Sequence, residues 1–75
     1  MKKYVIYGDN NYVYIGSLQQ IKFWREEDLL QNIDHRSSYI IEALDDKKEA
    51  MLKEEAAGGY IKLFYPRITR EKYYQ

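Results

Sequence analysis

Residues 3–16 have the sequence KYVIYGDNNYVYIG and are the clearest guide to the fold. Two runs rich in β-branched and aromatic residues flank the turn-forming residues 8–11 (GDNN), a pattern that predicts a β-hairpin. A two-residue turn, or a four-residue loop over all of 8–11, places Tyr7 opposite Tyr12. Because side chains alternate along a strand, this pairing also fixes which residues share a face.

With that pairing, the hairpin has one aliphatic face and one aromatic, basic face. The mostly aliphatic face consists of Tyr4, Ile6, Val13 and Ile15. The other face consists of Lys3, Val5, Tyr7, Tyr12 and Tyr14. An antiparallel sheet usually has one covered face, and the aliphatic face suits a core better. We therefore expect the tyrosines to be exposed, although a helix that covers them is the alternative.

Residues 17–33 fit two patterns. The spacing of Ser17 and Gln20 matches a capping box, which would start a helix directly after Ser17. The alternation over residues 19–24 favours a third strand instead. We prefer this strand, followed by a helix over roughly 26–33 whose first turn is acidic.

A helix is also predicted in the second half of the chain. Asp46 and Glu49 have capping-box spacing, strong helix formers continue to Ala57, and Gly58-Gly59 provides a stop.

The segments on either side of that helix favour strands. Residues 39–44 are either a strand that leads into it or its first turns, and we prefer the strand. Residues 60–65 predict a last strand, which Pro66 ends or marks as a sheet edge. The tail, residues 66–75, is basic and aromatic, and we expect it to be partly mobile.

Together these elements predict one α+β domain over residues 1–75. We expect a small, mainly antiparallel sheet, made of the N-terminal hairpin and the C-terminal strand, with one or two helices packed on one face. A domain this small buries little surface, and the chain has no cysteine for disulfides, so self-association into a homo-oligomer is a serious alternative source of stability.

The charges balance overall but are distributed unevenly. Twelve basic and twelve acidic residues give a net charge of zero. Residues 1–24 carry +2, residues 25–59 carry −5 and residues 60–75 carry +3. A dedicated double-stranded DNA binder would usually be basic throughout, so we do not expect that function.

No group of residues predicts catalysis. His35 is the only histidine and lies in a polar connector, where a solvated side chain is far commoner than a catalytic base. The acidic groups at 26–28 and 45–46 stand where helices begin, so capping explains them without a metal. We expect no enzyme activity, no cofactor and no metal site.

The residues that favour binding are aromatic or basic. Nine tyrosines in 75 residues exceed what a small core usually hides, and tyrosine is enriched in binding surfaces. The candidate binding residues are Lys3, Tyr7, Tyr12, Tyr14, Tyr60, Lys62, Arg67 and Arg70.

Three functions use this surface. The first hypothesis is a non-enzymatic module that binds another protein. In size and character the chain is similar to the short accessory proteins of phages and mobile elements, and this resemblance implies an inhibitor of a host protein. The second is a module that binds a small nucleotide or single-stranded nucleic acid, with bases stacked on the rings. The third is a structural homo-oligomer that buries the aromatic face against its own copy.

The expected location is the cytoplasm. The longest apolar runs near the basic start, Tyr4 to Tyr7 and Tyr12 to Ile15, have four residues each. A secretory signal needs about 7–15 apolar residues and a membrane span about 20. We therefore expect no contact with a membrane.

Overall fold

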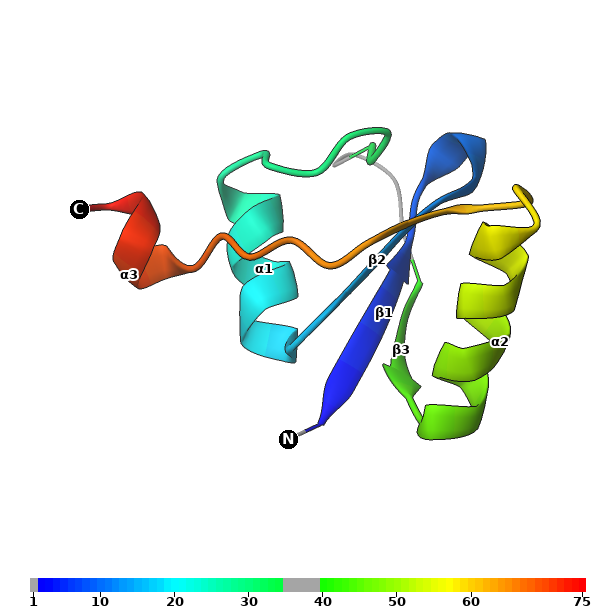
Figure 1. Ribbon diagram of the computed structural model, residues 1–75. Coiled ribbons are helices and arrows are strands. Elements are labelled where there is room, and N and C mark those ends of the chain that lie inside the picture. Colours follow the sequence, from blue (N-terminus) through cyan, green and yellow to red (C-terminus); the bar gives the residue numbers. More distant parts are fainter. Residues whose placement is uncertain (1, 35–39) are drawn as a thin grey trace.

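The computed structural model describes residues 2–34 and 40–75, which form a four-stranded sheet with three α-helices (Figure 1). His35 and the serines of the polar connector lie outside the described residues. The elements, in chain order, are β1 Lys3–Tyr7, a 3₁₀ turn Asp9–Asn11, β2 Tyr12–Gly16, α1 Leu18–Glu26, β3 Ile41–Leu44, α2 Asp46–Ala57, β4 Lys62–Phe64 and α3 Arg70–Tyr73. The predicted α+β class with an N-terminal hairpin is confirmed.

The strand order is β3-β1-β2-β4. β1 pairs antiparallel with both β2 and β3, whereas β4 pairs parallel with β2. The chain therefore leaves β3 on one edge, passes through α2 and returns as β4 on the opposite edge. β3 and β4 are the two edges of the sheet.

The turn of the hairpin differs from both expected turns. The Gly8 N–H donates to the Tyr12 carbonyl at 2.8 Å, which pairs these two residues and leaves three residues, Asp9–Asn11, in the turn. Asn10 and Asn11 have φ of 57° and 63°, the left-handed conformation that asparagine tolerates best among residues with a side chain. An odd number of turn residues shifts the pairing by one position, so Tyr7 lies opposite Val13 and not opposite Tyr12.

Because of that shift, the side chains of β1 lie on the opposite face, relative to those of β2, from the face that was predicted. Val5 now shares a face with Val13 and Ile15, and Leu52 of α2 covers them. Ile6 shares the other face with Tyr14, and α1 covers that face. The two helices therefore lie on opposite sides of the sheet (Figure 1), and the prediction that helices cover only one face is wrong.

α1 replaces the strand expected at 19–24 and the helix expected at 26–33. Its start is the capping box: the Gln20 N–H donates to the Ser17 hydroxyl, and the Gln20 side chain accepts from the Ser17 N–H. Its end is a Schellman motif, in which Asp28 takes φ 56° and the Leu29 N–H donates to the Trp24 carbonyl. The apolar residues after it, Leu29 and Leu30, contribute to the core from a loop.

α2 begins one residue earlier than a cap at Asp46 implies. Asp45 is the N-cap, and its carboxylate accepts from the Lys48 N–H at 2.7 Å. This frees Glu49 to point inward. The predicted stop is confirmed, because α2 ends at Ala57 and Gly59 takes φ 82°.

Both remaining strands are confirmed but are shorter than expected. β3 covers Ile41–Leu44, the last four residues of the expected 39–44, whose first residue lies outside the described residues; β4 covers Lys62–Phe64 of the expected 60–65. After Pro66 the chain crosses α1, where the Trp24 indole N–H donates to the Ile68 carbonyl at 2.7 Å. Figure 1 shows this C-terminal arm, residues 66–75, running from the sheet past α1 to α3.

Candidate binding site along the β4 edge

The structure separates the predicted aromatic face into two groups. Tyr12, Tyr14 and Lys62 lie together on the α1 side of the sheet. Lys3 and Tyr7 lie on the α2 side. Tyr14 is 4% exposed, so the expectation of an open tyrosine face is wrong. The register shift divides the predicted face into two groups, and α1, which packs on the Tyr14 side, buries Tyr14.

Phe64 of β4 joins the first group and forms its outer surface. Its ring stacks on Tyr12 at 5.4 Å and on Tyr14 at 5.3 Å between centroids, and it remains 39% exposed. The Lys62 ammonium lies 4.9 Å from the centre of the Tyr12 ring, a cation–π distance. These side chains meet because Lys62 and Phe64 are the register partners of Tyr12 and Tyr14 in the parallel pair.

Behind these stacked rings, Tyr14 is hydrogen-bonded to the loop that follows α1. Its hydroxyl donates to the Gln31 carbonyl at 2.8 Å and accepts from the Gln31 N–H at 2.9 Å. Burial raises the pKa of the Tyr14 hydroxyl, so the group stays protonated and can fill both roles. Tyr14 is therefore a core residue that fixes the loop after α1 beside β4.

A small cavity of about 270 Å³ opens between that loop and the end of β4. Its lining residues are Tyr14, Leu29, Gln31, Phe64, Tyr65 and Pro66. The walls are mainly apolar and aromatic, which is the character of a pocket for one apolar group.

Tyr65 points to the opposite side and contacts a buried carboxylate. Its hydroxyl donates to Glu49 at 2.6 Å, and the Lys3 ammonium lies 3.0 Å from the same carboxylate. The hydrogen bond from Tyr65, followed by that from Lys3, lowers the pKa of Glu49. Burial and the bond to Glu49 raise the pKa of Tyr65 to about 12. Lys3, a predicted binding residue, is thus tied into the fold.

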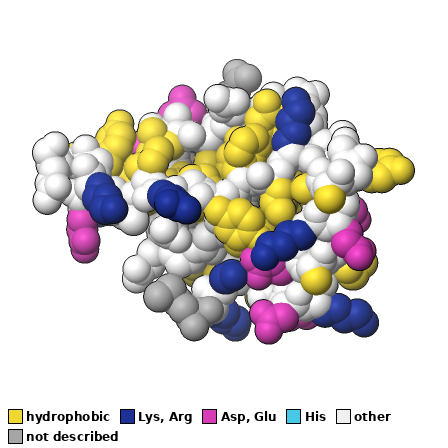
Figure 2. Space-filling model, viewed as in Figure 1, with side chains coloured by type: hydrophobic (Ala, Val, Ile, Leu, Met, Phe, Trp, Pro, Cys, Tyr) yellow, Lys and Arg dark blue, Asp and Glu magenta, His cyan; other side chains and the backbone are white. Residues whose placement is uncertain are grey.

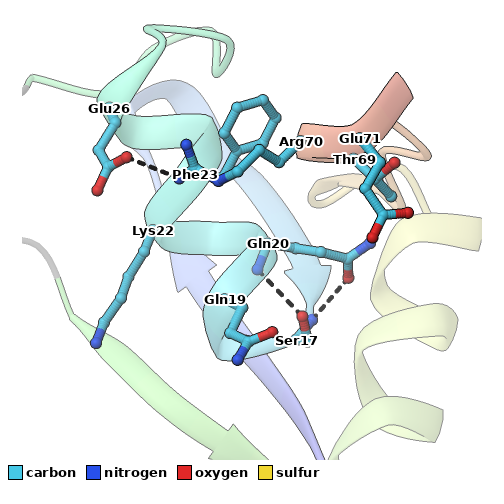
Figure 3. A pocket seen from close by; sticks show the side chains of 9 residues that line it. All are labelled: Ser17, Gln19, Gln20, Lys22, Phe23, Glu26, Thr69, Arg70 and Glu71. Carbon is cyan, nitrogen blue, oxygen red and sulfur yellow. Dashed lines mark hydrogen bonds and ion pairs between the residues drawn. The ribbon is translucent and has the colours of Figure 1, made fainter. Parts of the chain in front are cut away.

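Arg70 is likewise engaged within the molecule. Its guanidinium stacks 4.7 Å from the centre of the Phe23 ring and pairs with Glu26 at 2.9 Å. A hollow of about 490 Å³ lies here between α1 and the C-terminal arm, next to the Ser17–Gln20 capping box (Figure 3). Ser17 and Gln20 are engaged with each other in the capping box, and Glu26 is engaged with Arg70.

The other two predicted residues are open to solvent. Tyr60, 75% exposed, precedes β4, and Arg67 is exposed in the arm. Within residues 2–34 and 40–75, no carboxylate pairs with Lys62 or Arg67. Figure 2 shows hydrophobic side chains along this face of the molecule, with basic side chains between them and acidic side chains beside them on the α2 side.

Several site residues were missed from the sequence. Leu29 was placed in a helix, and Tyr65 and Pro66 were treated only as the end of a strand. Pro66 carried a usable signal, because a proline directly after a strand marks an edge. Nothing in the sequence indicated that Leu29 would reach the end of β4.

No family model, curated protein or solved structure matches this chain. In the described part of the chain, no three His, Cys, Asp or Glu side chains gather at a distance suited to a metal ion. The helices described are all too short and too polar to cross a membrane.

Proposed function

We propose that this protein is a non-enzymatic module that binds another protein by adding an extended segment of it to the outer edge of β4. One observation carries the proposal: β4 is the last strand of the sheet and displays exposed aromatic rings at that edge. An unpaired strand edge offers backbone donors and acceptors, and flanking pockets supply specificity. Phe64 and Tyr65, 39% and 42% exposed, supply contact area on its two sides.

An inhibitory role is the finer form of this proposal. A module that occupies a strand-binding groove or covers an extended segment of its target would block that segment. The small size of the chain suits such a role.

The test compares proteins that co-purify with tagged variants from the native host. Wild type should retain a protein at defined stoichiometry, and Phe64→Ser should lose it. The matched control is Met51→Ser, since Met51 is an apolar side chain of α2 that is 53% exposed. If both variants retain the co-purified protein, and circular dichroism shows that both are folded, the β4 edge is not the binding site.

The nucleotide or single-strand alternative is favoured by one observation, the Lys62 ammonium over the Tyr12 ring beside Phe64. This group could hold a phosphate next to a stacked base. Lys62→Ala combined with Arg67→Ala should then weaken oligonucleotide binding strongly, and affinity should fall steeply with salt. Affinity unchanged by both would count against nucleic acid.

Self-association is the third function, and the same edge serves it better than the tyrosine face. Tyr14 is buried under α1 and cannot meet a second copy. Sedimentation of wild type and Phe64→Ser would identify an assembly built through β4, because only wild type would then form it.

A further inference from the structure

We infer that the segment bound at the β4 edge is acidic and carries one large apolar side chain that enters the cavity between β4 and the loop after α1. This inference rests on the proposed function and specifies its partner. It follows from the position of the cavity, the exposure of the rings and the charges beside the strand.

The apolar side chain follows from the position of the cavity. Side chains of an added strand alternate between the two faces, as they do along β4. Those on the α1 side meet Phe64 and the cavity of about 270 Å³ lined by Leu29 and Pro66. A single leucine-sized or phenylalanine-sized group suits a space of this size and character. Neighbouring positions on the same side would contact the exposed Phe64 ring.

The acidic character follows from the charges around the edge. Lys62 stands in β4 and Arg67 follows it, and no described carboxylate neutralises either. Lys53 of α2 lies 5.9 Å from the Tyr65 ring on the other side; it pairs with Glu49 at 3.9 Å, but its side chain is 62% exposed and can also meet a partner. Residues 60–75 carry a net +3. Carboxylates on the partner would meet cations on both sides.

The same charges disfavour a second copy of this chain. In a β4–β4 pairing, the basic segments of two copies would face each other at the edge, where like charges repel. The same basic residues attract an acidic partner and repel a second copy of the chain.

The test is a titration with three synthetic nine-residue peptides, followed by amide NMR. The first has glutamates at both ends and alternating valine and threonine around a central leucine. The second replaces the leucine with alanine, and the third replaces every glutamate with lysine. The first should shift the amide signals of β4 and the loop after α1. The second should bind about tenfold or more weakly, as expected for losing one large buried side chain.

Charge reversal in the protein provides the matched comparison. The double variant Lys62→Glu, Arg67→Glu should bind the glutamate peptide more weakly and the lysine peptide more tightly than the wild type does. Lys22→Glu with Lys47→Glu changes the net charge equally at exposed positions of α1 and α2, and should leave the preference unchanged.

Each other outcome overturns the inference. Equal binding of the glutamate and lysine peptides would refute the inference that the partner is acidic. Equal binding of the leucine and alanine peptides would refute the inference that an apolar side chain enters the cavity. If an oligothymidine shifts the amide signals of β4 and no peptide does, the edge binds nucleic acid and not a protein segment. If all peptides fail while Phe64→Ser still loses the co-purified protein, the proposed function stands and only the partner chemistry is wrong.

Discussion

Glu49 shows how one residue ties two distant parts of the chain to α2. It is 7% exposed and accepts hydrogen bonds from Lys3 of β1 and from Tyr65 after β4. A buried carboxylate costs free energy unless it is paired, so these two contacts make its position tolerable. The sequence predicted a capping role for Glu49, and nothing in its spacing revealed partners 46 and 16 residues away.

Glu49→Gln should lower the free energy of unfolding by about 1–3 kcal/mol at pH 7, because a hydrogen-bonded buried charge is lost. The folded-state pKa of Glu49 lies below its ordinary value, so its stabilisation is present above the unfolded-state pKa. It disappears as the pH falls through the folded-state pKa. Urea unfolding at several pH values should therefore show the two proteins converging in acid. Glu54→Gln, exposed on the same helix, should show no such difference.

Gly16 is a second position where one residue decides local packing. A Cβ atom there would lie 2.5 Å from Cη2 of the fully buried Trp24 ring. Gly16→Ala should therefore destabilise the protein by about 1–3 kcal/mol through overpacking. Urea unfolding followed by Trp24 fluorescence measures this. Unchanged stability would mean that the indole shifts freely, contrary to its hydrogen bond with Ile68.

At the level of elements, the short turn Asp9–Asn11 controls the rest of the sheet. The hairpin itself was predictable from residues 3–16, but the number of turn residues was not, since 8–11 suits several turns. In the structure the turn also contacts the loop after α1, because the Asp9 N–H donates to the Asn32 carbonyl at 2.7 Å. The turn that sets the register is therefore held by a contact with a residue 23 positions further along the chain. Such a contact cannot be predicted from the local sequence of the turn.

Asn11→Val should cost about 1–2 kcal/mol, because a β-branched residue is strained at φ 63°. Asn11→Gly should be close to neutral or slightly stabilising, since glycine adopts this conformation freely. Thermal unfolding of the two variants gives the comparison. Equal stability of both would contradict the left-handed turn and, with it, the one-residue shift in register.

Other elements show where sequence patterns suffice. The end of α2, its start to within one residue, and most of β3 and β4 were predicted because caps, glycines and β-rich runs act locally. α1 was mistaken for a strand because Ile21 and Phe23 alternate, although Ser17 and Gln20 carried the correct signal. The covering of β1 and β2 on both faces was not predicted, because it depends on the register of the hairpin and on where α1 and α2 pack.

For the whole molecule, the C-terminal arm closes the α1 side of the structure. Ile68 accepts from Trp24, and the rings of Tyr73 and Tyr74 lie 5.6 Å and 6.1 Å from the Phe23 ring. Arg70 adds its contacts with Phe23 and Glu26. The arm was predicted as a basic tail with binding residues, and in the structure much of its contact area faces α1.

Removal of residues 68–75 should destabilise the protein by about 1–3 kcal/mol, because the Trp24 indole N–H loses its acceptor and Phe23 becomes exposed. The fluorescence maximum of Trp24 should shift to longer wavelength. Ile68→Ala keeps the backbone acceptor and should leave the maximum nearly unchanged. An unshifted maximum in the shortened protein would show that the arm does not cover Trp24.

We propose that a partner adds a strand at the edge formed by β4, and hydrogen–deuterium exchange of the protein alone and with its co-purified partner can detect this. We expect slower exchange at Lys62–Phe64 in the complex, with exchange in α2 around Met51 unchanged. Protection confined to α2 or to the C-terminal arm, with β4 exchanging as in the free protein, would contradict it.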